Sequence, residues 1–286
     1  MVRSITQDSR YRVASELSIC PAIGRSSECA CDVSTPGWYI QQLIKLSIAR
    51  HISAEYYVIL DSDIICMKAV SYASLIHNGR ALTNVETPRD YHRLYNAEAA
   101  MQETSCKQGR YRRSAALLGY TRPSRLHNRF YGETPVALHT KSVLALTAHI
   151  ERRFLQPWDR FLLSRSDWTE YSLYFQYLEM FELLYSVTKL KDCNEVLDLE
   201  RSVWLGTAKY RDYRLYNRRH FTKRRWNGGG YFMAVQSWLR PSLWLPPSYT
   251  TTAEFYRDVE RWLLPLNSRY PEMLASDASS CRARSE

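Results

Sequence analysis

Tyr56-Tyr57-Val58-Ile59-Leu60-Asp61-Ser62-Asp63 is the stretch that decides the fold of this chain, because an apolar run ends there on two acids. Residues 56–60 are short, continuous, partly β-branched and flanked by polar residues. They predict a strand buried on both faces of a parallel or mixed sheet. Asp61 and Asp63 follow at its carboxyl end, where ligands bind in open α/β sheets. Two acids there are costly unless a positive group meets them.

Further elements on both sides of this strand complete an α/β pattern. Thr35 can cap a helix whose first turn holds Pro36, and apolar residues then recur at helical spacing, so we expect an amphipathic helix over 36–51. Later patterns predict strands over 81–85, 135–139 and 231–235, helical stretches near 92–103, and helices from Ser142 to about 153 and from Asp167 to about 185. The predicted fold class is therefore α/β.

The composition of the 286-residue chain, 45% hydrophobic and 24% charged, fits a soluble globular protein with one large α/β domain or two small ones. A formal net charge of +10 favours anionic partners such as nucleotides, phosphosugars, nucleic acid or anionic lipid headgroups. The sequence predicts neither a signal peptide nor a transmembrane helix. The odd count of seven cysteines favours free thiols in a reducing compartment. We expect a cytoplasmic protein whose basic surface also suits peripheral contact with a membrane.

Asp61 and Asp63 have the residue type and spacing of a site for Mn²⁺ or Mg²⁺. Both ions prefer carboxylate oxygens and keep open positions for substrate phosphates. A divalent cation on a diphosphate bridges phosphate oxygens and neutralises the charge that builds as the bond to the leaving group breaks. Two acids at positions i and i+2 suit that role where the backbone turns just after a strand. The alternative is a polar loop in which either acid caps the next turn.

Four blocks of the chain follow one another in an order that matches a known family. The first runs from Gly37 to Leu46 (GWYIQQLIKL), and the second runs from Tyr57 to Asp63 (YVILDSD). The third runs from Thr134 to Thr140 (TPVALHT), the fourth runs from Trp168 to Tyr174 (WTEYSLY), and Val235-Gln236-Ser237 resembles a closing strand. Together these blocks resemble an uncharacterised bacterial branch of GT-A glycosyltransferase-like domains.

The resemblance implies a GT-A-like mixed, mostly parallel sheet flanked by helices in a single domain. We expect residues 36–240 to form this domain, 1–35 to be a segment without clear assignment, and 241–286 to be a C-terminal extension with a frayed tail. A βαβ unit takes about 30 residues or more, and only 60 residues precede Asp61. We therefore expect a truncated N-terminus that lacks the first βα unit and part of the nucleotide-base pocket.

The first block supplies candidate donor-binding residues beside Asp61. Trp38, Gln41, Gln42 and Lys45 share one face of the predicted helix. The resemblance implies that this face contacts a nucleoside-diphosphate sugar, with Lys45 toward phosphate. The alternative is a solvated helix face.

The fourth block supplies the candidate catalytic base, Glu170, since many GT-A enzymes place an acid near the acceptor at such a helix start. An inverting transferase needs a carboxylate that takes the proton of the acceptor hydroxyl; a retaining enzyme does not. The alternative is structural, because Asp167-x-x-Glu170 matches a capping-box pattern. Trp168, Tyr171 and His139 are the other acceptor-side candidates, and a structural role is the alternative for His139.

The basic segment 209–225 holds His220, which the resemblance suggests as a third metal ligand. Arginines and lysines alternate there with aromatic residues, a composition that suits nucleic acid, a diphosphate or an anionic membrane surface. Three hypotheses follow. The favoured one is a metal-dependent glycosyltransferase that acts on a glycan, lipid-linked or protein acceptor. The second is a non-catalytic remnant of such an enzyme, and the least favoured is a nucleic-acid-binding protein.

Overall fold

Helices and short strands alternate along the chain, which makes the fold mixed α/β, as the sequence predicts. The computed structural model describes residues 13–28, 36–121, 128–166, 168–200, 202, 229–236 and 249–267. The chain divides into two compact units. The first unit comprises Met1–Ile59, Ser105–Glu133 and Ala137–Thr188, and the second comprises Leu60–Thr104, Thr134–Val136 and Lys189–Glu286. The expected domain boundaries near residues 35 and 240 both lie outside the described residues.

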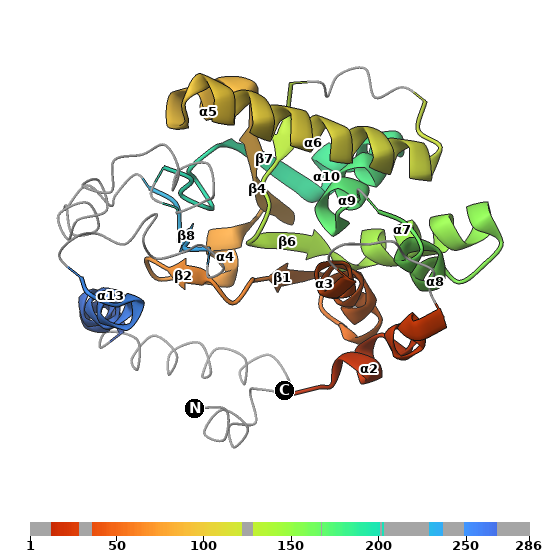
Figure 1. Ribbon diagram of the computed structural model, residues 1–286, viewed down its shortest axis with the longest axis horizontal. Coiled ribbons are helices and arrows are strands. Elements are labelled where there is room, and N and C mark those ends of the chain that lie inside the picture. Colours follow the sequence, from red (N-terminus) through yellow and green to blue (C-terminus); the bar gives the residue numbers. More distant parts are fainter. Residues whose placement is uncertain are drawn as a thin grey trace, which may run out of the picture. The chain divides into compact units, whose positions relative to one another are not determined.

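The first unit is mainly helical (Figure 1). Its elements, in chain order, are α2 (Glu16–Ile19), η1 (Pro21–Glu28), α3 (Pro36–Ser47), η2 (Ile48–His51), β1 (Tyr56–Ile59), α6 (Ala97–Leu118, from Ser105 on), β5 (Phe130–Tyr131), β6 (Val136–His139), α7 (Thr140–Phe154), α8 (Trp158–Leu163), α9 (Glu170–Met180) and α10 (Leu184–Val187). Helices α3 and α7 each pack against α8 and α9. Large side chains such as Trp158, Trp168 and Phe175 are fully buried there, each worth about 1.5–3 kcal/mol of transfer free energy or more.

Strand β1 confirms the strand predicted over 56–60, but it ends at Ile59 and pairs with β6. The prediction that it is buried on both faces is wrong at Val58, which is 40% exposed. On one face of β1, Tyr57 and Ile59 are both buried. On the other face, Tyr56 is buried and Val58 is exposed. The tyrosine hydroxyls meet their hydrogen-bond needs inside, because Tyr56 donates to the Val187 carbonyl and Tyr57 to the Lys45 carbonyl, each at 3.0 Å.

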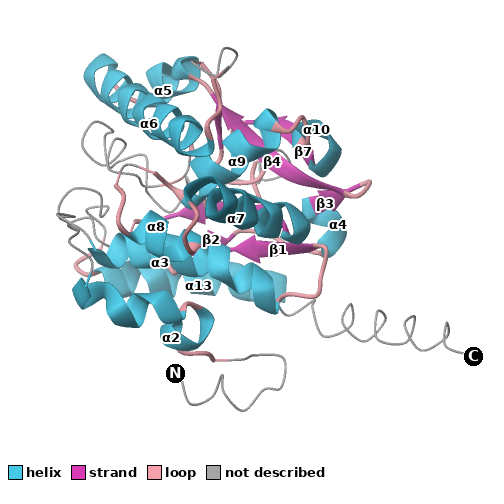
Figure 2. Cartoon of the chain, turned by 90° about the vertical axis from the view of Figure 1, so that its right-hand side faces the viewer, coloured by secondary structure: helices cyan, strands magenta, loops and turns pink. Residues whose placement is uncertain are grey.

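The second unit carries most of the strands (Figure 2). Its elements are β2 (Ile64–Cys66), α4 (Tyr72–Leu75), β3 (Ile76–His77), β4 (Arg80–Glu86), α5 (Pro88–Leu94), β7 (Thr188–Asp192, from Lys189 on), β8 (Phe232–Ala234) and α13 (Thr252–Asn267). Strand β2 pairs antiparallel with β8, β3 pairs antiparallel with β4, and β7 also pairs with β4. Within the described part of the chain the strands thus form small sheets, and the antiparallel pairs differ from the mostly parallel sheet that the resemblance implies.

The apolar core of the second unit lies beside a buried asparagine that binds backbone groups. Leu75, Leu94, Leu197 and Phe232 belong to one buried apolar cluster. Beside it, the buried Asn84 side chain accepts from the Val196 N–H at 2.8 Å and donates to the Leu197 carbonyl at 2.9 Å. The Asn84 side-chain amide thus satisfies backbone groups of Val196 and Leu197 that would otherwise be buried without these hydrogen bonds.

Of the helices predicted between β4 and α9, the first prediction is confirmed and the start of the second is corrected. The helical stretches expected near 92–103 are found as two helices, because α5 ends at Leu94 and α6 starts at Ala97. Thr87 caps α5 reciprocally with Asp90, and Pro88 occupies its first turn. Helix α7 starts at Thr140 rather than at Ser142, so Ser142 does not cap it.

The helix of the fourth block also starts differently from the prediction. Thr169 is the N-cap of α9 and shares a capping box with Ser172, so Glu170 is the first helical residue rather than the third of a box. Asp167, the expected cap, lies outside the described residues. The helix ends at Met180, and Glu182 adopts φ 57° before α10 begins, so the expected helix to residue 185 is broken.

Candidate functional site

The two acids after β1 lie on a β-turn of the second unit. The Ile64 N–H donates to the Asp61 carbonyl at 3.2 Å, which closes the turn. The Asp61 N–H donates to the Thr134 hydroxyl at 3.0 Å, and the Val235 N–H donates to the Asp63 carbonyl at 2.9 Å. Both acids are half-buried. The backbone of the turn is therefore fixed by two segments far away in the sequence.

Helix α13 lies close enough to this turn to sense its charge. Burial, and then the negative charge of Asp63, raise the pKa of the Tyr256 hydroxyl on α13. The Asp63 carboxylate therefore lies near enough to Tyr256 to disfavour a second negative charge there.

Asp61 and Asp63 are the residues of this turn that could hold a divalent cation. Asp61 and Asp63 offer the hard oxygen ligands that Mn²⁺ and Mg²⁺ take, and Mg²⁺ is commonly held by one or two carboxylates plus substrate phosphates. Among the residues that the structure describes, no three His, Cys, Asp or Glu side chains gather into a group that could hold a metal ion. His220, the expected third ligand, lies outside the described residues.

Lys45 and Glu170, predicted as donor-side and catalytic residues, form an ion pair in the first unit. Lys45 Nζ lies 2.9 Å from Glu170 Oε1, and their side chains are 10% and 0% exposed. Gln42 completes the pair: with its amide nitrogen turned toward Glu170, it donates to both carboxylate oxygens. The Lys45 ammonium also lies 5.3 Å from the centre of the Tyr171 ring. Sequence alone did not link these residues, although each was singled out.

The predicted donor-binding face of α3 is divided by burial. Gln42 and Lys45 are buried, whereas Gln41 is exposed and Trp38 is 37% exposed. The structure therefore brings Gln42 and Lys45 to Glu170 and leaves Gln41 at the surface. The Trp38 ring instead lies 5.6 Å from the guanidinium of Arg110 on α6.

The three acceptor-side candidates are held in different ways. His139 is the N-cap of α7; its Nδ1 lies 2.8 Å from the Ser142 hydroxyl, and burial lowers its pKa. Trp168 is fully buried, and its Nε1 donates to the carbonyls of Leu162 and Arg165, each at 3.2 Å. Tyr171 packs beside Lys45 and is 5% exposed. The hydrogen bond of His139 agrees with the structural alternative for that residue.

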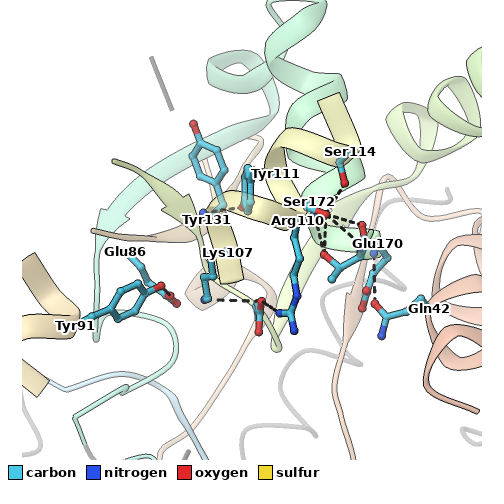
Figure 3. Close-up of polar contacts among 12 residues, drawn as sticks. Gln42, Glu86, Tyr91, Lys107, Arg110, Tyr111, Ser114, Tyr131, Glu170 and Ser172 are labelled. Atoms are coloured by element: carbon cyan, nitrogen blue, oxygen red, sulfur yellow. Dashed lines mark hydrogen bonds and ion pairs between the residues drawn. The ribbon is translucent and has the colours of Figure 1, made fainter. Parts of the chain in front are cut away.

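A second ionic cluster of the first unit was missed in the sequence. Figure 3 shows Lys107 and Arg110 pointing the same way from helix α6. Lys107 Nζ lies 3.7 Å and Arg110 Nη1 lies 3.5 Å from the same oxygen, Glu133 Oε1. Burial opposes ionisation of Glu133, but Lys107, Arg110 and Lys45 outweigh it and hold the pKa of that carboxyl below its usual value. The available signal was the i, i+3 spacing of the two cations, which lie beyond the helical stretches predicted near 92–103.

One more carboxyl of the first unit has a perturbed protonation equilibrium. The Tyr131 hydroxyl donates to Glu179 Oε1 at 2.5 Å, and the Gln176 amide donates to Oε2 at 3.4 Å. Burial raises the pKa of Glu179 to about 7, against the opposing effect of these two hydrogen bonds. Neither the sequence blocks nor a motif pointed to this residue.

No helix of the described residues is both long and apolar enough to cross a membrane. The basic segment 209–225 lies outside the described residues. No curated protein and no solved structure matches the chain. The model of a family of unknown function, DUF6492, matches residues 1–258, which is most of the sequence and includes both the Asp61–Asp63 turn and the Lys45–Glu170 pair. The chain therefore belongs to DUF6492, a family of unknown function.

Proposed function

We propose that this chain is a metal-dependent glycosyltransferase, which transfers a sugar from a nucleoside-diphosphate donor to a glycan, lipid-linked or protein acceptor. The observation that carries the proposal is the Asp61–Ile64 turn. Two half-buried carboxylates stand there on a backbone that Thr134 and Val235 hold in place. A pre-organised pair of oxygen ligands is what a nucleotide-bound cation requires.

Asp61 and Asp63 have the role of metal ligands in this proposal. They would hold Mn²⁺ or Mg²⁺, and a divalent cation there would supply charge neutralisation for the leaving diphosphate. The hydrogen bonds from the Asp61 N–H to Thr134 and from the Val235 N–H to the Asp63 carbonyl fix the backbone of the turn, so that little ordering of that backbone is required on binding. The four-block resemblance to GT-A domains supports the assignment of the donor class.

Glu170 is given a positioning role rather than that of the base. Its carboxylate is fully buried and paired with Lys45, so a proton transfer from an acceptor would require the pair to open. The pair instead fixes the start of α9 against α3, next to Tyr171. A mechanism that needs no carboxylate base of this kind, as in retaining transferases, agrees with that arrangement.

The test is calorimetric titration of UDP and of GDP into the full chain, with and without Mn²⁺. We expect one nucleotide to bind only with Mn²⁺, and Asp61→Asn and Asp63→Asn each to weaken that binding at least tenfold. Asp192→Asn, which changes an exposed acid of the same unit, is the matched control and is expected to bind like the parent chain. Failure of a folded chain to bind either nucleotide would refute the proposal in favour of a non-catalytic relative.

A further inference from the structure

We propose that the corner between helices α7 and α8 is a docking surface for an anionic lipid bilayer. The two helices pack against each other in the first unit (Figure 2), and residues 155–157 connect them. The cationic side chains exposed along this corner are those of Arg152, Arg153, Arg160 and Arg165. Within the described part of the chain, none of these arginines forms an ion pair with a carboxylate. The α7–α8 corner therefore presents its positive charge to solvent.

Leu155 is an apolar tip in the middle of these arginines. Its side chain is 90% exposed, although it is a large aliphatic group. Its backbone is left-handed, with φ 53° and ψ 35°. This conformation is costly for a residue with a Cβ, and glycine or asparagine ordinarily occupies it after a helix. Folding thus gains neither from the backbone nor from burial of Leu155, which points to a role in binding something outside the chain.

A stack of aromatic rings orients two of the arginines beside Leu155. The Phe154 and Phe161 rings lie parallel within 16°, with their centres 3.7 Å apart. The Arg153 guanidinium lies 5.5 Å from the centre of the Phe154 ring, and that of Arg165 lies 5.1 Å from the centre of the Phe161 ring. A guanidinium that contacts a ring through its face keeps its N–H groups for other acceptors. The corner therefore offers oriented donors for phosphate next to an apolar tip.

A second exposed apolar side chain lies near the other side of Arg152. The Phe181 side chain is 43% exposed, and its ring centre lies 5.5 Å from that of His149, one turn before Arg152 on α7. Glu151 is the neighbouring acid on this helix, but residues at i, i+1 and i, i+2 do not face each other, so Glu151 does not shield Arg152 or Arg153. Apolar and cationic side chains therefore alternate on this surface.

A bilayer is the partner that satisfies both kinds of side chain. Its anionic headgroups carry phosphates, which suit the planar fork of arginine. The acyl region beneath them takes up exposed apolar side chains such as Leu155 and Phe181. A nucleic acid would meet the charge but would leave the aliphatic tip in water. The expected contact is peripheral, with the arginines among the headgroups and Leu155 at the boundary of the acyl chains.

The test is flotation of the full chain with lipid vesicles at physiological ionic strength. One set of vesicles is phosphatidylcholine alone, and the other is an equimolar mixture with phosphatidylserine. EDTA is present and nucleotide is absent, so this test and that of the proposed function fail separately. We expect the chain to float with the mixed vesicles and not with phosphatidylcholine, and raised salt to weaken the binding. Equal binding to both vesicles, or none to the mixed ones, would overturn the proposal.

Leu155→Gly is the decisive variant, because glycine suits the left-handed backbone and removes only the apolar tip. We expect about tenfold weaker partition into the mixed vesicles, from the lost burial of one leucine side chain. The midpoint of urea unfolding is expected to be unchanged or higher, so that the loss cannot come from misfolding. Leu155→Asn is expected to behave alike without the added freedom of glycine. Partition equal to that of the parent chain in both variants would overturn the proposal.

Arg152→Gln tests the charge of the corner and is expected to weaken partition about fivefold. Lys141→Gln and Leu144→Ala are the matched controls, because both residues are exposed on the same helix. Lys141 lies roughly 16 Å along the helix axis from Arg152, which exceeds the Debye length of about 8 Å. Both controls are expected to bind like the parent chain. Equal losses in the controls, or binding of a single-stranded oligonucleotide in place of the vesicles, would overturn the proposal.

Discussion

The Lys45–Glu170 pair predicts unequal costs for the removal of its two charges. Lys45→Met strands a carboxylate that is fully buried, and loss of one partner of a buried ion pair costs about 3–5 kcal/mol of unfolding free energy. Glu170→Gln leaves an ammonium that is still 10% exposed, lies over the Tyr171 ring and senses Glu133. Its expected cost is about 1.5–3 kcal/mol, the value for a lost hydrogen bond to a charged group. The double variant removes both charges, so its loss of unfolding free energy is expected to be smaller than the sum of the losses of the two single variants.

The measurement is urea unfolding of the parent chain, both single variants and the double variant. Intrinsic tryptophan fluorescence is a suitable probe, because Trp168, one of the eight tryptophans, is fully buried and lies two positions before Glu170. Midpoints compared at a common slope give the coupling free energy, expected to be about 2 kcal/mol for groups in direct contact. Equal costs for the two single variants, or simple additivity in the double variant, would refute the reasoning.

The remaining predictions concern stability. Gly109→Ala is expected to stabilise the chain by about 0.5–1 kcal/mol in urea unfolding, because Gly109 lies inside helix α6 and an added Cβ would meet nothing within 4 Å. Gly230→Ala is expected to destabilise the chain by about 1–3 kcal/mol, because the added Cβ would lie 2.6 Å from the backbone nitrogen of Asp198. Thr169→Ala is expected to cost about 1–2 kcal/mol and Thr169→Ser much less, because only the alanine removes the cap of α9; equal losses would contradict the capping role. For Glu179, the folded pKa of about 7 exceeds the ordinary value of 4.5, so the unfolded chain ionises first and stability falls as pH rises between these values. Glu179→Gln should therefore make the melting temperature depend less on pH between about 4.5 and 7. The same pH dependence in the variant and the parent chain would contradict the burial of that carboxyl.

Local features were predictable where one short stretch determines them. The apolar run before Asp61 specifies β1, and the acids after it specify the turn, because both depend on neighbours in sequence. The strand over 81–85 and the final strand over 231–235 are found as β4 and β8 with small shifts. The α/β class follows from the same patterns.

Features that depend on packing were not predictable. Asp167 and Thr169 can both cap a helix, and the burial of Trp168 between them selects the register in which Thr169 is the cap. Burial on both faces of β1 failed because the apolar composition of Val58 does not reveal whether another segment covers it. The link between Lys107, Arg110 and Glu133 joins a helix to a residue well beyond it, and charges on a polar helix are ordinarily solvated.

The pairing of β2 with β8 has a consequence for how the chain is synthesised. Ile64 pairs with Ala234, and the Asp63 carbonyl accepts from Val235, so the acidic turn gains these bonds only after residue 235 has left the ribosome. Pairings between residues so distant in sequence form slowly and leave strand edges exposed in the meantime. The helices of the first unit can therefore be buried during synthesis, whereas the edge of β2 stays unpaired until β8 has been made.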